Sequence, residues 1–186
     1  MIAGMRRKGR TARWSALGVG AVVLVLVAVL ATRQQASMVM AESPLVGRTA
    51  PAISAPLFSG RTESLSSLRG RWVVVNFFAP WCDQCRQEEP QLEQFLYSRP
   101  EGRRTAVLGV LYGDTEADGR SFQAAAGATW PSVVDPSGLI ASAYGVGSLP
   151  RSFLVDPAGR VVASIEGAVS SPQLDRWIEQ EAARGE

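Results

Sequence analysis

The sequence of 186 residues contains no histidine and only two cysteines, Cys82 and Cys85. A structural zinc site needs four ligands, so carboxylates or a second chain would have to complete one here. The missing histidine also removes the usual third copper ligand, which argues against a copper chaperone. We therefore expect no metal site, and the two cysteines, three positions apart, become the main chemical feature of the chain.

Acidic residues outnumber basic ones outside the N-terminus. Five of the nineteen Lys and Arg residues precede position 14, and a sixth is Arg33. From Ala41 onward, thirteen basic residues stand against seventeen acidic ones, a net charge of −4. Because this part of the chain has no basic stripe, we expect no nucleic-acid partner.

Residues 14–31 form an uncharged stretch dominated by Val, Leu and Ala. As a helix this stretch would extend roughly 27 Å, just enough for a hydrocarbon core of about 30 Å. The basic residues within 1–13 predict that this first segment stays in the cytoplasm and that the chain after the stretch lies outside. We therefore expect a single-pass anchor in the cell membrane at 14–31, a polar linker at 32–43 and one extracytoplasmic domain at 44–186.

A cleaved signal peptide has the same arrangement of charge, although its apolar run is usually shorter. Two small-residue sites, 29–31 and 39–41, fit cleavage, so the sequence leaves this alternative open. No cysteine lies near the apolar stretch, which excludes a lipoprotein anchor.

The two cysteines follow an apolar run at 72–79 that is rich in β-branched and aromatic residues and predicts a strand buried on both faces. From Cys82 to about Ser98 the spacing of apolar residues predicts a helix, kinked at Pro90. Cys82 is therefore expected at a helix N-terminus, where free N–H groups and the helix dipole stabilise a thiolate. Cys85 lies one turn further on the same face, close enough to form a disulfide with Cys82.

The remaining pattern predicts an α/β domain. A strand at 105–112 after the helix implies a right-handed crossover to a parallel neighbour, which places Cys82 at the carboxyl edge of the sheet. The other expected elements are a β-hairpin (55–57 and 62–65), a helical turn (66–70), helices at 115–126 and 139–144, a segment (130–135) that leads to a turn at 136–138, two strands joined as a hairpin (152–156 and 160–166) and a final helix from Ser171.

Two motifs resemble the membrane-anchored thioredoxin-like thiol-disulfide oxidoreductases of cytochrome c biogenesis, the TlpA, ResA and CcmG (DsbE)-like group. The first spans 76–86 with Glu88 and Pro90 behind it, and the second spans 144–156. The resemblance extends from about Pro44 to the C-terminus. It implies a thioredoxin fold with an N-terminal β-hairpin extension, preceded by one transmembrane helix.

The resemblance assigns roles to residues around the cysteines. It implies that Pro150 is cis and lies against the two cysteines, and that the backbone of Leu149 pairs with a substrate chain. Trp81 would pack beside the cysteines and cover the exchange surface, whereas the alternative for Trp81 is a place in the core.

Proton handling is also implied by the resemblance. Ordinary thioredoxins carry a buried aspartate six residues before the first cysteine, where this chain has Asn76. Glu88, six residues after Cys82, matches an acidic residue of the membrane-anchored group that takes over this role. The alternative for Glu88 is a solvated glutamate on the helix surface, like its neighbour Glu89. Between the cysteines, Asp83 departs from the Pro or Gly that is common in the group, which leaves the reduction potential open.

These features predict an extracytoplasmic protein-disulfide oxidoreductase. The Cys82 thiolate attacks a partner disulfide, and Cys85 then releases the reduced partner. The resemblance implies apocytochrome c, or a protein that delivers it, as one substrate and a membrane dithiol protein as electron donor, so no cofactor is needed. The sequence leaves as alternatives an oxidant that introduces disulfides into exported proteins, a thiol peroxidase and a non-enzymatic thioredoxin-like binding module. A thiol peroxidase would need threonine at position 79, which is alanine.

Overall fold

The computed structural model describes residues 39–40, 43–98 and 105–184. These residues belong to one compact unit, Met38–Glu186. The predicted membrane anchor at 14–31 lies outside the described residues. Within the described part of the chain, no helix has the length and apolarity needed to cross a membrane.

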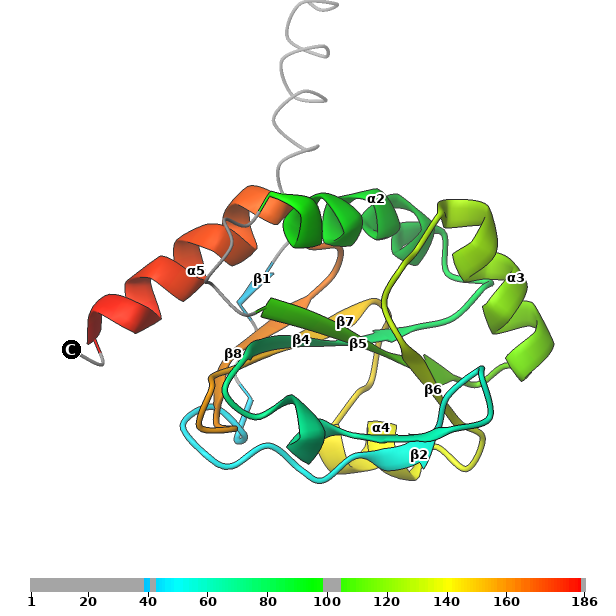
Figure 1. Ribbon diagram of the computed structural model, residues 1–186, viewed down its shortest axis with the longest axis horizontal. Coiled ribbons are helices and arrows are strands. Elements are labelled where there is room, and N and C mark those ends of the chain that lie inside the picture. The colour runs from blue at the N-terminus through cyan, green and yellow to red at the C-terminus, as the bar shows by residue number, and fades with distance from the viewer. Residues whose placement is uncertain (1–38, 41–42, 99–104, 185–186) are drawn as a thin grey trace, which may run out of the picture. The chain divides into compact units, whose positions relative to one another are not determined.

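A six-stranded sheet forms the centre of this unit, with the order β1-β8-β7-β4-β5-β6 (Figure 1). β4, β5 and β6 are parallel, whereas β7, β8 and β1 alternate in direction. The strands are β1 (Val39–Met40), β4 (Trp72–Phe78), β5 (Thr105–Tyr112), β6 (Ser132–Asp135), β7 (Arg151–Val155) and β8 (Val161–Glu166).

Helices cover both faces of the sheet. Figure 1 shows α2 (Asp83–Tyr97), α3 (Glu116–Ala126) and α5 (Ser171–Arg184) on one face. The other face carries α4 (Leu139–Tyr144) and the hairpin of β2 (Ser54–Pro56) and β3 (Thr62–Ser64), which is followed by the 3-10 turn η1 (Leu65–Leu68). This arrangement confirms the predicted thioredoxin-like α/β fold with its N-terminal hairpin.

The apolar run predicted at 72–79 forms the central strand β4, in which apolar and polar residues do not alternate and only Asn76 is polar. Side chains of a strand alternate between the two faces of a sheet, and here both faces are covered. Val74 packs with Leu92 and Leu174 in the core under α2 and α5. Val75 and Phe77 belong to the opposite core, which the hairpin and α4 close.

One difference from the sequence-based expectation concerns the linker predicted at 32–43. Val39 and Met40 form β1, which pairs with Glu166 and Ile165 of β8. The linker prediction is wrong for these two residues, because a segment so short has no hydrophobic pattern that could reveal it. β1 pairs with the edge of β8 that does not face β7, and so covers an edge strand that would otherwise have unpaired backbone groups.

Candidate active site

The turn after β4 brings Cys82 to the start of α2, as predicted. Cys82 is the N-cap residue of this helix, and its Sγ accepts a hydrogen bond of 3.1 Å from the backbone N–H of Cys85. A sulfur atom in this position faces the unpaired N–H groups and the positive end of the helix dipole. The site therefore favours the thiolate form of Cys82 in the reduced protein.

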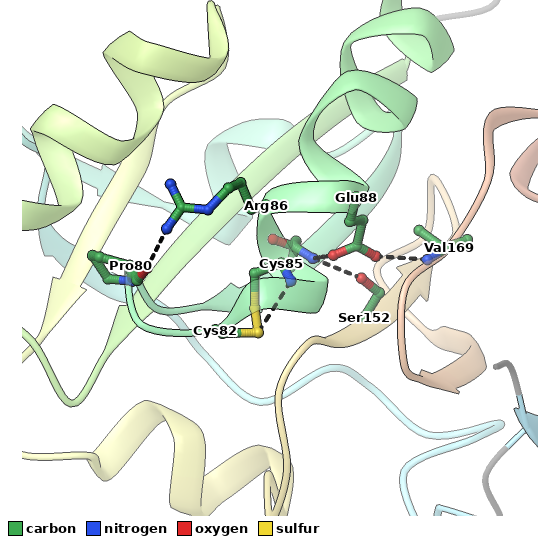
Figure 2. The surroundings of a disulfide bond; sticks show 8 residues. Pro80, Cys82, Cys85, Arg86, Glu88, Ser152 and Val169 are labelled. Atoms are coloured by element: carbon green, nitrogen blue, oxygen red, sulfur yellow. Dashed lines mark hydrogen bonds between the residues drawn. A yellow bond between two sulfur atoms is a disulfide. The ribbon is translucent and has the colours of Figure 1, made fainter.

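Cys82 and Cys85 are joined by a disulfide, with 5.2 Å between their Cα atoms (Figure 2). Cys82 retains 6% of its surface, whereas Cys85 is fully buried. An external thiol or disulfide can therefore reach only Cys82. The neighbouring Trp81 is 61% exposed, so it lies on the surface beside the disulfide and the alternative of a core tryptophan is wrong.

The segment before β7 lies against the cysteines. The Leu149–Pro150 peptide bond is cis, as predicted. The Leu149 side chain packs against the apolar cluster that contains both cysteines together with Phe78, Leu111 and Phe122. Among the described residues, no backbone group pairs with the N–H or C=O of Leu149.

Glu88 lies in the interior, one turn along α2 from Cys85, and only 1% of its surface is exposed. Its carboxylate accepts a hydrogen bond of 2.9 Å from the Val169 N–H (Figure 2). It also accepts one of 2.8 Å from Asn76 Nδ2. Asn76 Nδ2 also donates to Ser152 Oγ at 3.0 Å. The alternative of a solvated surface glutamate is therefore wrong.

The surroundings of Glu88 act on its pKa in opposite directions. Burial is the larger effect because it disfavours the charged carboxylate. Hydrogen bonds from Val169, Asn76 and Ser152 oppose this effect by stabilising the carboxylate. The result is a pKa of about 7 for Glu88, which suits a group that gains and loses a proton near neutral pH.

Glu89 is a buried acid that the sequence analysis placed in solvent, and that expectation is wrong. Only 2% of Glu89 is exposed, and its Oε2 has no hydrogen-bond partner in the described structure. Burial, followed by repulsion from Glu88 and Glu93, raises the pKa of Glu89 to about 8. Because α2 packs against both α5 and α3, its buried stripe is wider than the apolar pattern alone indicates.

Arg86 is a residue to which the sequence analysis gave no role. Its Nη2 donates a hydrogen bond of 3.1 Å to the carbonyl of Pro80 (Figure 2). Its guanidinium also lies over the ring of Phe122, 5.4 Å from the centroid. Arg86 thus connects the turn that carries Trp81 and Cys82 to α2 and α3. Asp83, which lies in the same helical turn, is exposed to solvent.

Together, the sheet, the Cys-x-x-Cys pair at a helix start and the adjacent cis-proline define a thioredoxin-like thiol-disulfide oxidoreductase. The AhpC/TSA family model matches residues 46–164. The chain therefore belongs to the AhpC/TSA family.

Relatives and solved structures agree with this class. A ResA thiol-disulfide oxidoreductase from Geobacillus thermodenitrificans is 33% identical over 134 residues, which cover 72% of this chain and 76% of the relative. ResA of Bacillus subtilis is 29% identical over 159 residues, 84% of this chain and 88% of the relative. A crystal structure assigned as the thiol:disulfide interchange protein DsbE of Chlorobium tepidum superimposes with a TM-score of 0.65 at 29% identity, covering 71% of this chain and 94% of that one.

Proposed function

We propose that this protein reduces disulfides of partner proteins outside the cytoplasm, in the maturation of cytochrome c. The observation that carries the proposal is the contrast between the cysteines: Cys82 reaches the surface at a helix N-terminus, while Cys85 is fully buried near a buried carboxylate. This division suits a nucleophile and a resolving thiol. The similarity to proteins named thiol-disulfide oxidoreductase ResA supports disulfide exchange. The choice of pathway rests on the resemblance of the motifs at 76–86 and 144–156 to the cytochrome c biogenesis group.

The reaction begins in the reduced protein. The Cys82 thiolate attacks one sulfur of the partner disulfide, which releases the other partner sulfur as a thiolate and forms a mixed disulfide. Cys85 then gives its proton to Glu88 and attacks Cys82 Sγ. This step restores the Cys82–Cys85 disulfide and releases the second partner sulfur, so two electrons pass from the protein to the partner.

The surface around Cys82 provides a place for a polypeptide substrate. The free backbone groups of Leu149 can pair with an extended chain, as a sheet edge pairs with an added strand. Trp81, exposed beside the disulfide, offers an apolar contact to the same chain. The partners we propose are apocytochrome c, or a protein that delivers it, and a membrane dithiol protein that reduces the disulfide again.

The location we propose follows from the sequence. The uncharged stretch at 14–31, preceded by basic residues, would anchor the protein in the cell membrane and leave the oxidoreductase domain on the extracytoplasmic side. Peroxide reduction is disfavoured because position 79 is a buried alanine instead of threonine.

The reduction potential of the Cys82/Cys85 couple tests the direction of the reaction. The full chain is equilibrated with defined mixtures of reduced and oxidised dithiothreitol or glutathione, and the dithiol fraction is measured by thiol labelling. We expect a value near or below about −250 mV, in the range of reductants. A value above about −180 mV would identify an oxidant that introduces disulfides into exported proteins and would remove the cytochrome assignment.

A further inference from the structure

Residues 146–149, within the segment that joins α4 to β7, reach the disulfide with few polar attachments. At its start, the Val146 N–H donates to the carbonyl of Ala141, and at its end the Pro150 carbonyl accepts from the Gly167 N–H at 3.0 Å. Between these two points, one hydrogen bond holds the segment to the described structure: Ser148 Oγ lies 2.7 Å from Glu166 Oε1.

Glu166 is itself held in place by Arg151, the first residue of β7. Arg151 Nη1 donates to the other carboxylate oxygen, Glu166 Oε2, at 2.9 Å. The carboxylate therefore bridges the segment before Pro150 and the residue directly after it. Arg151 and Glu166 also face each other in the register of β7 and β8, so the backbone pairing fixes the base of the bridge.

Arg151 is a rigid anchor for this bridge. Its side chain is 10% exposed, whereas that of Glu166 is 50% exposed. Arg151 Nη2 donates to Ser164 Oγ at 2.9 Å, and the guanidinium lies over the Phe153 ring at 5.5 Å from the centroid. A planar guanidinium held by two buried partners, Ser164 and Phe153, has little freedom to turn, so it determines where the Glu166 carboxylate lies.

The ion pair itself is a weak source of stability, since half of the Glu166 side chain is in solvent. Its geometric effect is larger, because the Glu166 carboxylate presents its second oxygen to Ser148. Ser148 directly precedes Leu149, whose side chain packs on the cysteine cluster. A shift of Ser148 would therefore move the backbone groups of Leu149 relative to Cys82.

We infer that Arg151 and Glu166 are positioning residues that act through Ser148 to hold the Leu149 backbone where an extended substrate chain can pair with it. This inference rests on the proposed function, because it concerns the docking of a polypeptide disulfide. A small disulfide does not use backbone pairing, so its reaction with Cys82 should not depend on the bridge. The two kinds of substrate therefore separate positioning from the chemistry of the cysteines.

The experiment compares Ser148→Ala with the unsubstituted full chain, purified in mild detergent. Insulin reduction, with dithiothreitol as terminal reductant, reports on a protein substrate, and the reaction of the reduced protein with 5,5′-dithiobis(2-nitrobenzoate) reports on a small one. We expect the KM for insulin to rise roughly three- to tenfold, with kcat little changed, since one hydrogen bond is lost. The rate with the small disulfide should stay the same.

Further variants separate the bridge from a general loss of structure. Ser148→Thr keeps the hydroxyl group and should restore the KM for insulin. Glu166→Ala removes the bridge completely and should raise the KM at least as much as Ser148→Ala. Ser137→Ala makes the same chemical change at an exposed serine in the turn after β6 and should have no effect.

The outcomes distinguish this inference from the proposed function. If the unsubstituted protein reduces insulin and Ser148→Ala does so with the same KM, the positioning role is wrong while the proposed function stands. An equal loss of rate with both disulfides would also overturn it, because the substitution would then act on the cysteines or the fold. If the unsubstituted protein does not reduce insulin at all, the proposed function fails and the inference fails with it.

Discussion

At the scale of single residues, the two cysteines differ most in their access to solvent, with 6% of Cys82 exposed and none of Cys85. We predict that Cys85→Ser accumulates a mixed disulfide with a protein substrate, because Cys82 can still attack but nothing resolves the product. Cys82→Ser should form no such adduct. Non-reducing gel electrophoresis and mass spectrometry after incubation with oxidised insulin measure both variants. Adducts through Cys85 in the Cys82→Ser protein would contradict the assignment.

Glu88 should control how the resolving step depends on pH. Below its pKa of about 7 the carboxyl group is protonated and cannot take the Cys85 proton, so resolution should speed up as pH rises through this value. Glu88→Gln should remove this rise and slow resolution by roughly 100-fold at pH 8, the lower end of the usual effect of a general base. Stopped-flow measurement of release from a preformed mixed disulfide, between pH 5.5 and 8.5, gives the profile.

The control for Glu88 is Glu116→Gln, which neutralises an exposed acid on α3. This variant should keep the profile of the unsubstituted protein. A profile for Glu88→Gln that still rises around pH 7 would show that another group accepts the proton.

The residues at the centre of the site could be predicted from the sequence, but their surroundings could not. The pattern of a buried strand followed by a helix placed Cys82 and Cys85 at the sheet edge, and the resemblance to a known family placed Pro150 against them. Burial of Glu89 depends on α3 and α5, which come from distant parts of the chain and cover both sides of α2. No local pattern shows that coverage, so the sequence placed Glu89 in solvent.

At the scale of elements, strands with a long apolar run were predicted closely. The bounds of β5 match the expected 105–112. The strand is a run of eight mostly apolar residues, and the glycine and two arginines just before it mark clearly where the run begins. β1 has two residues and was missed. Its existence depends on the unpaired edge of β8, which is a property of the assembled sheet.

Gly109 in β5 provides a test of the packing beneath α2. It pairs with Ser132 of β6 and Asn76 of β4, and a Cβ atom at Gly109 would lie 2.0 Å from Ser132 Oγ and 3.1 Å from the Phe78 ring. We predict that Gly109→Ala destabilises the protein by about 1–3 kcal/mol, because this core cannot accept an added methyl group without shifts. Urea unfolding of a fragment that begins at Met38, and so keeps β1, measures the change.

Two further variants show whether the Ser132 hydroxyl is the obstacle. Gly109→Ala combined with Ser132→Ala should recover part of the loss, since the closest atom is gone. Gly147→Ala, where nothing lies within 4 Å of the added Cβ, should change stability by less than about 0.5 kcal/mol. Equal stability of Gly109→Ala and the unsubstituted fragment would contradict the predicted packing.

At the scale of the whole molecule, two adjacent buried acids make the stability of the fold depend on pH in an unusual direction. Surface carboxylates in ion pairs usually have lowered pKa values and lose their contribution in acid. Glu88 and Glu89 have raised values of about 7 and about 8, from an ordinary 4.5. Between pH 4.5 and about pH 8 the folded protein therefore binds more protons than the unfolded chain, so the free energy of unfolding should fall as pH rises.

We predict that the free energy of unfolding of the oxidised Met38 fragment decreases by a few kcal/mol between pH 5 and pH 8.5, because about 1.4 kcal/mol accompanies each unit of pKa difference. Below pH 4.5 both acids are protonated in the folded and unfolded states, and the stabilising effect is complete. Above pH 8 both must ionise in the interior, next to each other, and the effect is lost. Urea unfolding at intervals of one pH unit measures the curve.

The double variant Glu88→Gln, Glu89→Gln isolates the contribution of this pair. It should lose most of the decline between pH 5 and pH 8.5, while any dependence that comes from the exposed acids remains. The difference between the two curves therefore belongs to the two buried carboxyl groups. If that difference stays constant across the range, the pair does not take up protons on folding, and Glu88 would lack the neutral-range pKa that its role in the resolving step requires.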